Sequence, residues 1–127
     1  MKSLRTLALA AGLLALTTAP TAWSQQSWPT RPVKVLVGFA PGGGGDILTR
    51  AFSAELEKSL GQPFVVENRP GANGTIAIDA TAKSPPDGYT MVLVISANII
   101  DVLVRKDMPF DLMRDIAPIS LIVTNPL

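Results

Sequence analysis

The chain has 127 residues, of which 47% are hydrophobic and 17% are charged, so its length suits one small domain or part of a larger one. Its 11 Lys and Arg residues against 10 Asp and Glu residues give a net charge of +1, too small for the basic surface that nucleic-acid binding requires. The lack of Cys and His excludes disulfides, thiol catalysis, the usual zinc sites and a His-based catalytic triad within this chain.

The first 24 residues have the pattern of a secretory signal peptide. Lys2 and Arg5 form a positive segment, and the apolar stretch Leu7–Leu16 is too short to span a bilayer. Small residues precede Gln25, so we predict cleavage after Ser24, which would leave a mature net charge of −1. The alternative is an N-terminal helix of a cytosolic protein.

The mature chain begins with a predicted strand, a glycine-rich turn and a predicted helix. The apolar, β-branched run Val33–Phe39 predicts a strand buried on both faces, as in a parallel sheet. Apolar residues then recur every four positions from Leu48 to Leu60 and predict the buried side of an amphipathic helix. Thr49 and Ser53 fall on the other side, and Gly61 is well placed to end the helix.

The rest of the chain continues the alternation of strands and helices. A helix between two strands favours parallel pairing with a right-handed crossover, so the order predicts an open α/β sheet. Pro118 indicates that pairing of the last strand starts late. The further predicted elements are strands at Phe64–Glu67, Thr90–Ile95 and Ile116–Val123 and short helices at Thr75–Lys83 and Ile99–Val104.

The loop from Ala40 to Asp46 contains four consecutive glycines between a strand and a helix. Backbone amides at such a helix N-terminus point into one space and, with the helix dipole, form a seat for an anion. The carboxyl ends of parallel strands are also where open α/β sheets bind ligands. A P-loop needs Lys and Ser or Thr after Gly45, and a dinucleotide fingerprint needs Gly at Ile47, so both nucleotide motifs fail. The alternative is a glycine hinge that binds nothing.

A second glycine-containing loop runs from Asn68 to Gly74, again between a strand and a helix. In a parallel sheet it lies at the same edge as the first loop, and together the two loops make a seat for one carboxylate. The alternative is an ordinary connection with a Pro-Gly turn. Ser96 follows the third strand and is either a hydroxyl donor to the same pocket or a helix-cap or turn residue.

Two charged residues near these loops have two interpretations each. Asp46 lies in the first turn of the helix, where it caps the helix or complements its dipole, or else orders water or meets an amino group of the ligand. Arg69 could pair with a ligand carboxylate, but we favour a salt bridge with a nearby acid such as Glu67.

These observations define the candidate site. We predict no catalytic residue, no metal site and no cofactor. The candidate ligand-binding residues are Phe39, Ala40, Gly42, Gly43, Gly44, Asp46, Gly71, Ala72, Asn73 and Ser96, of which Phe39 is included because of the resemblance described next.

Several segments in chain order resemble the tripartite tricarboxylate transporter substrate-binding proteins, also called Bug-type receptors. The resemblance implies an α/β, periplasmic-binding-protein-like fold of type II, with two domains that close like a Venus flytrap. The segments are Trp28–Lys34, Phe39–Asp46, Val66–Gly74 and Pro86–Thr90, with Asp115–Leu121 as a further one.

The resemblance also implies a function and partners. A periplasmic receptor of this family captures a small organic acid or acidic amino acid and passes its ligand to a membrane transporter. We also expect a monomer, and the small net charge predicts no nucleic-acid binding. Loops 39–46 and 71–74 would clasp the ligand carboxylate through backbone groups and waters. The alternatives are a receptor that signals to a membrane sensor and a non-functional fragment.

Two features depart from the family pattern. Family members often carry a His-containing segment after the third strand, whereas Ser96–Asp101 contains no His, and Asn73 stands where Gly is common. Family members are also much longer. We therefore expect a truncated chain, with residues 25–127 forming the first part of the N-terminal α/β ligand-binding domain.

Overall fold

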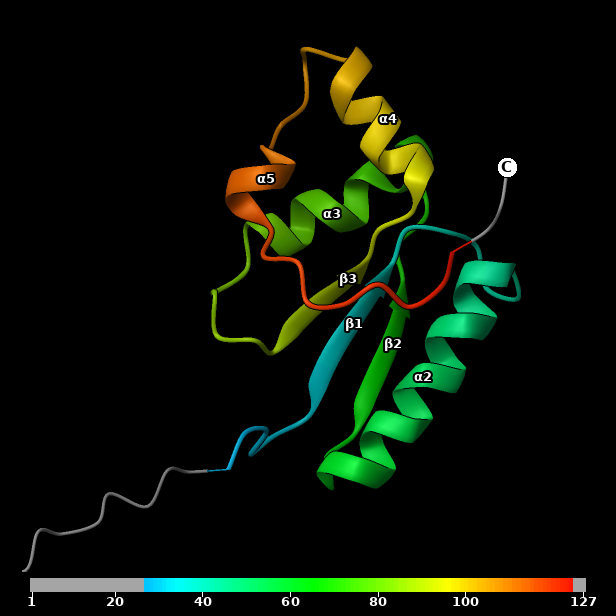
Figure 1. Cartoon of the computed structure of the whole chain (residues 1–127), viewed down its shortest axis with the longest axis vertical. Coiled ribbons are helices and arrows are strands. Elements are labelled where there is room, and N and C mark those ends of the chain that lie inside the picture. The colour runs from blue at the N-terminus through cyan, green and yellow to red at the C-terminus, as the bar shows by residue number, and fades with distance from the viewer. Residues whose placement is uncertain (1–26, 125–127) are drawn as a thin grey trace, which may run out of the picture.

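The computed structural model describes residues 27–124, so the predicted signal peptide lies outside the described residues. A sheet of three parallel strands, β1 (Val33–Val37), β2 (Phe64–Asn68) and β3 (Thr90–Leu93), forms its centre (Figure 1). Their order is β2-β1-β3, with Val35 of β1 opposite Val66 and Met91. The predicted parallel α/β sheet is therefore confirmed.

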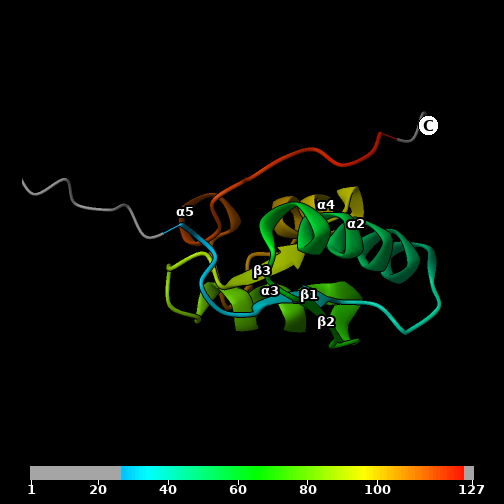
Figure 2. The same ribbon diagram turned by 90° about the horizontal axis from the view of Figure 1, so that it is seen from below.

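Helices cover the two faces of the sheet. Helix α2 (Gly44–Leu60) packs against β2 and β1, and helix α3 (Thr75–Ala82) packs against β1 and β3 on the opposite side (Figure 2). Val33 on one face of β1 and Leu36 on the other are at most 1% exposed. The central strand is thus buried on both sides, as its apolar sequence predicts.

Both ends of α2 are set by glycine. The helix begins after Gly43, which is the N-cap without a side-chain hydrogen bond. It ends at Gly61, whose φ of 72° is left-handed and whose N–H donates to the Glu57 carbonyl at 2.9 Å. The predicted C-terminal glycine is confirmed, because an L side chain adopts this backbone conformation only at a cost.

The predicted buried side of α2 is only partly right. Leu56 packs against the core cluster of Val33, Val35 and Phe64, as expected. Thr49 and Ser53 are each 5% exposed, although periodicity placed them outward, while Phe52 is 42% exposed. Thr49 tolerates burial because its hydroxyl donates to the Gly45 carbonyl at 2.7 Å, which satisfies the polar group.

The second half of the chain contains short elements. A 3₁₀ turn, η2 (Ala72–Gly74), precedes α3. Helix α4 (Ser96–Val104) begins three residues earlier than the predicted Ile99. A single turn, α5 (Leu112–Asp115), is capped by the Asp111 carboxylate, which accepts from the Met113 and Arg114 amides. Across the described chain, no helix has the length and apolarity to cross a membrane.

The predicted fourth strand at Ile116–Val123 is wrong. Residues 116–124 form neither strand nor helix and run past the sheet on the side of α2 (Figures 1 and 2). Pro118 has no N–H to donate to a neighbouring strand. Ile119 and Leu121 are 77% and 78% exposed, so burial of their side chains does not favour strand pairing either. The segment instead borders a groove of about 1680 Å³ that α2 and β3 also line.

Candidate functional site

The two glycine-containing loops meet at the carboxyl edge of the sheet, as their positions after β1 and β2 predict. Gly38, just past β1, packs directly on Gly74 at the end of the second loop. A Cβ atom built on Gly38 would lie 2.4 Å from the Gly74 Cα, which is far inside van der Waals contact. Only glycine at residue 38 allows this approach of the two loops.

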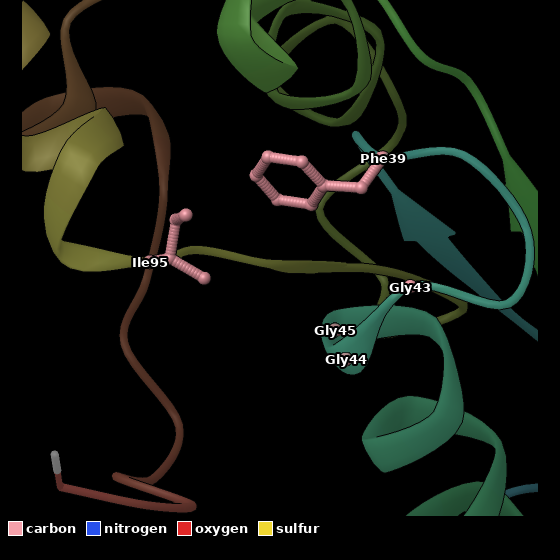
Figure 3. A pocket seen from close by; sticks show the side chains of 5 residues that line it. All are labelled: Phe39, Gly43, Gly44, Gly45 and Ile95. Carbon is pink, nitrogen blue, oxygen red and sulfur yellow. The ribbon is translucent and has the colours of Figure 1, made fainter.

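The first loop forms one wall of a small hollow. The hollow measures about 220 Å³, and its lining consists of Phe39, Gly43, Gly44, Gly45 and Ile95. The Phe39 ring and the Ile95 side chain flank the space, and the three glycines stand at the start of α2 (Figure 3). The hollow thus combines apolar sides with exposed backbone at a helix N-terminus.

Backbone amides at this helix N-terminus are available to a ligand. The Gly43 N–H donates to the Ala40 carbonyl at 3.3 Å, and the Ile47 N–H donates to the Gly43 carbonyl at 3.0 Å. Within residues 27–124, no acceptor is found for the amides of Gly44 and Gly45. The first N–H groups of a helix have no intrahelical partner, and together with the helix dipole they attract an anion.

Asp46 is buried below the loop instead of facing the hollow. The residue is only 3% exposed, and its carboxylate accepts hydrogen bonds from the Gly42 N–H at 2.9 Å, Arg50 Nε at 3.0 Å and Asn68 Nδ2 at 2.8 Å. The hydrogen bonds from Arg50, Gly42 and Asn68 hold the pKa of the Asp46 carboxyl well below its usual range. Of the interpretations left open for Asp46, a structural role near the helix start fits this geometry.

Arg50 and Asn68 were not predicted as part of the site. Arg50 follows Asp46 by four residues, a spacing that brings side chains together on a helix and could have signalled the pair. Asn68 ends β2, and only the folded sheet brings it to Asp46. Its amide also donates to the Phe39 carbonyl at 3.1 Å, which ties β2 to the first loop.

The second loop has an unusual backbone and faces α4. Positive φ angles occur at four successive residues, 132° at Gly71, 46° at Ala72, 53° at Asn73 and 86° at Gly74. The Asn73 amide donates to Asp101 Oδ2 at 2.7 Å. Asn73 therefore tolerates the left-handed conformation while its side chain contacts α4, and none of residues 71–73 lines the hollow.

Ser96 is the first residue of α4, and it is exposed. The N-cap is Ile95, whose N–H donates to Asn98 Oδ1 at 2.9 Å, so the helix-cap interpretation of Ser96 is wrong. Asn98 is 2% exposed and also donates to the Asn73 carbonyl, so it joins the third strand's end to the second loop.

Arg69 pairs with Glu67, as the sequence favours. The Arg69 Nε lies 2.6 Å from Glu67 Oε1, and Lys34 Nζ lies 3.4 Å from Glu67 Oε2. The hydrogen bonds from Arg69 and Lys34 lower the pKa of the Glu67 carboxyl. Of the ten predicted ligand-binding residues, the structure brings Phe39, Gly43 and Gly44 together in the lining of the hollow.

Solved structures similar to this chain are periplasmic binding proteins. A structure described as a periplasmic transporter has a TM-score of 0.62 and 38% identity, covering 66% of this chain and 29% of that one. The malate-bound MatC protein of Rhodopseudomonas palustris has a TM-score of 0.65 and 36% identity, and the match covers 69% of this chain and 30% of MatC. A second protein of that species, solved with adipate, has a TM-score of 0.59 and 38% identity, and the match covers 66% of this chain and 28% of that protein. The chain thus has part of the α/β fold of periplasmic binding proteins.

The sequence comparisons identify the family. The model of the tripartite tricarboxylate transporter family receptor matches residues 48–127. A UPF0065 protein of Bordetella bronchiseptica is 44% identical over 97% of this chain and 36% of its own length, and BugT of Bordetella pertussis is 41% identical over 82% and 32%. The chain belongs to the tripartite tricarboxylate transporter receptor family. It spans about a third of the length of these relatives.

Proposed function

We propose that this chain carries ligand-binding loops of an extracytoplasmic receptor for small organic carboxylates. The observation that carries the proposal is the hollow after β1, where the amides of Gly44 and Gly45 are free of acceptors within the described residues. An anion there gains two N–H donors and the positive end of the α2 dipole. Membership of a receptor family for carboxylate uptake supports the same function.

The neighbours support the ligand class. Two of them were solved with malate and with adipate, which are both small dicarboxylates. In this chain we propose direct contacts from Phe39, Gly43 and Gly44, which line the hollow. For the other predicted residues at this edge, we propose contacts through water or after domain closure. They are Ala40, Gly42, Gly71, Ala72, Asn73 and Ser96.

Location and mechanism belong to the same proposal. Residues 1–24 direct the protein to the periplasm, and a second domain closes over the hollow, since hinge closure is how periplasmic binding proteins trap ligands. The loaded receptor then delivers the acid to a membrane transporter. Sequencing the N-terminus of protein from the periplasmic fraction tests the first step, and we expect it to begin at Gln25.

Calorimetric titration of the full-length mature protein tests the binding itself. Adipate and malate are titrated separately, with inorganic phosphate as the control anion. We expect saturable one-to-one binding of at least one of the two dicarboxylates and none of phosphate. If neither dicarboxylate nor any further organic acid binds, the proposed function is wrong.

A further inference from the structure

A network of three polar side chains, of which Asp46 is buried, Asn68 half-buried and Arg50 half exposed, contacts the glycine loop. Asp46, Arg50 and Asn68 come from the start of α2, its second turn and the end of β2. Asp46 and Asn68 are joined at 2.8 Å, Arg50 Nε and Asp46 Oδ2 at 3.0 Å, and Arg50 Nη2 and Asn68 Oδ1 at 2.8 Å. Each member therefore contacts both others, which fixes all three side chains.

The network holds two points of the loop backbone. Asp46 Oδ2 accepts from the Gly42 N–H at 2.9 Å, and Asn68 Nδ2 donates to the Phe39 carbonyl at 3.1 Å. Phe39 supplies a side of the hollow, and Gly42 directly precedes the glycines that line it. A loop of successive glycines is flexible by itself, so these two hydrogen bonds select one of its many conformations.

The network also determines the charge beside the hollow. An unpaired carboxylate at Asp46 would repel an anion bound at the amides of Gly44 and Gly45, which lie within two residues of it in sequence. Arg50 places a guanidinium within 3.0 Å of Asp46, so the pair has no net charge. Arg50 itself is half exposed at 50%, whereas Asp46 is buried.

We propose that Arg50 and Asn68 are positioning residues: they hold the Phe39–Asp46 loop in its ligand-ready form and neutralise Asp46, without contacting the ligand. The proposal rests on the proposed function, because it concerns the same hollow. It assigns a binding role to two residues that lie outside the lining.

Substitutions in the full-length protein test both parts of the role, with adipate and malate as probes in calorimetry. Arg50→Gln removes the positive charge. Arg50→Lys keeps the charge but removes the guanidinium group, which donates to both Asp46 and Asn68. We expect Arg50→Gln to weaken dicarboxylate binding at least tenfold. The affinity of Arg50→Lys should lie between those of wild type and Arg50→Gln. Lys58→Gln on the same helix is the control, because Lys58 pairs only with exposed Glu55 and should bind like wild type.

Charge rescue separates this role from a merely structural one. In the double variant Arg50→Gln/Asp46→Asn, the uncompensated carboxylate is gone, so we expect affinity to recover most of the loss. Asn68→Ala, which keeps the charge pair, should weaken binding by loosening the loop. Circular dichroism and melting temperature establish that each variant is folded.

Distinct outcomes overturn distinct claims. Wild-type affinity in folded Arg50→Gln and Asn68→Ala overturns the positioning role. A double variant that binds no better than Arg50→Gln overturns the neutralising role. If Arg50→Gln does not fold, Arg50→Lys and Asn68→Ala decide the positioning role in the same way. A wild-type protein that binds no organic acid contradicts the proposed function instead.

Discussion

Single atoms decide how the two loops meet. Gly38 and Gly74 approach so closely that a Cβ on Gly38 would lie 2.9 Å from the Gly74 carbonyl oxygen as well as 2.4 Å from its Cα. At Gly44 the opposite holds, because a Cβ there meets no atom within 4 Å. Gly38 is therefore required for packing, whereas Gly44 leaves open space beside the hollow.

Gly38→Ala should destabilise the protein. The added methyl group clashes with backbone at Gly74, which cannot rotate away as a side chain would, so the loops must separate. Overpacking of this kind costs about 1–3 kcal/mol, measured as a change in the free energy of unfolding in urea. An unchanged free energy would show that the loops are not packed as described.

Gly44→Ala should instead reduce binding without reducing stability. The methyl group has open space and replaces a helical glycine, so stability stays level or rises by up to about 1 kcal/mol. It crowds the hollow that Gly44 lines, and we expect dicarboxylate affinity to fall about tenfold, or about 1.4 kcal/mol. Gly61→Ala at the other end of α2 is the control: it should lower stability and leave affinity unchanged. Undiminished affinity in Gly44→Ala would place the ligand elsewhere.

Asp46 predicts a specific pH dependence. Its pKa in the folded state lies below the ordinary value of 3.8, so its stabilising contribution is present above that value and is lost as pH falls further. Asp46→Asn should therefore be less stable than wild type at pH 7, and the difference should shrink as pH falls below about 4. Urea unfolding at pH 7, 4 and 3 measures this, with Glu55→Gln as a control on the same helix. A difference that persists undiminished at pH 3 would contradict the ionised network.

At the scale of elements, a helix packed on the sheet buries some of its side chains and exposes others. Helix α3 contains a matched pair, since Ile78 is 1% exposed and Ile76 is 50% exposed. Ile78→Ala should cost about 2–5 kcal/mol of unfolding free energy, because it leaves a cavity under the sheet. Ile76→Ala should cost far less. Equal effects in urea denaturation would show that α3 is rotated from the position described.

The elements with a strong local signal were predictable from sequence. β1 is continuous and apolar, Gly61 marks the end of α2, and strands separated by helices pair in parallel. The predicted ends of these elements were less accurate. β1 stops at Val37 instead of Phe39, because the chain packs against Gly74 at Gly38. The local pattern fixes the existence of an element, whereas the packing of loops fixes its last residues.

The predictions that failed concern features that depend on contacts between residues far apart in the sequence. Periodicity could not reveal that Asp46, Thr49 and Ser53 are the buried residues of α2. The Asp46 carboxylate finds a partner in Asn68 of β2, and the Thr49 hydroxyl finds one in the Gly45 carbonyl of the preceding turn. Ile116–Val123 has strand composition, but composition does not provide a partner strand. Of the site, the glycine loop was predictable, and the Arg50 and Asn68 contacts were not.

At the scale of the whole molecule, much apolar surface remains exposed. The exposed fractions are 79% for Leu103, 89% for Met113 and 78% for Leu121. Met113 and Leu121 line the apolar groove that α2 and β3 also line. Large exposed apolar surfaces are typical of regions that contact another protein or another domain. The relatives have about three times the length of this chain.

We therefore expect residues 25–127 expressed alone to bind the hydrophobic dye ANS and to unfold without a cooperative transition. BugT of Bordetella pertussis, a relative of about three times this length, should unfold cooperatively and bind little dye. Fluorescence and urea titration compare the two proteins directly. A sharp transition in residues 25–127 would show that the exposed groove needs no further cover.

The most direct test of the central claim is a thermal-shift panel on the full-length mature protein. Succinate, malate, adipate, citrate, glutamate and benzoate are compared with phosphate and ATP. A ligand at 100 times its dissociation constant adds about 2.7 kcal/mol, which moves the melting temperature clearly. The account predicts a large shift with at least one organic acid and none with ATP. Stabilisation by ATP or phosphate alone would show that the glycine loop is a phosphate site, and would contradict the carboxylate receptor.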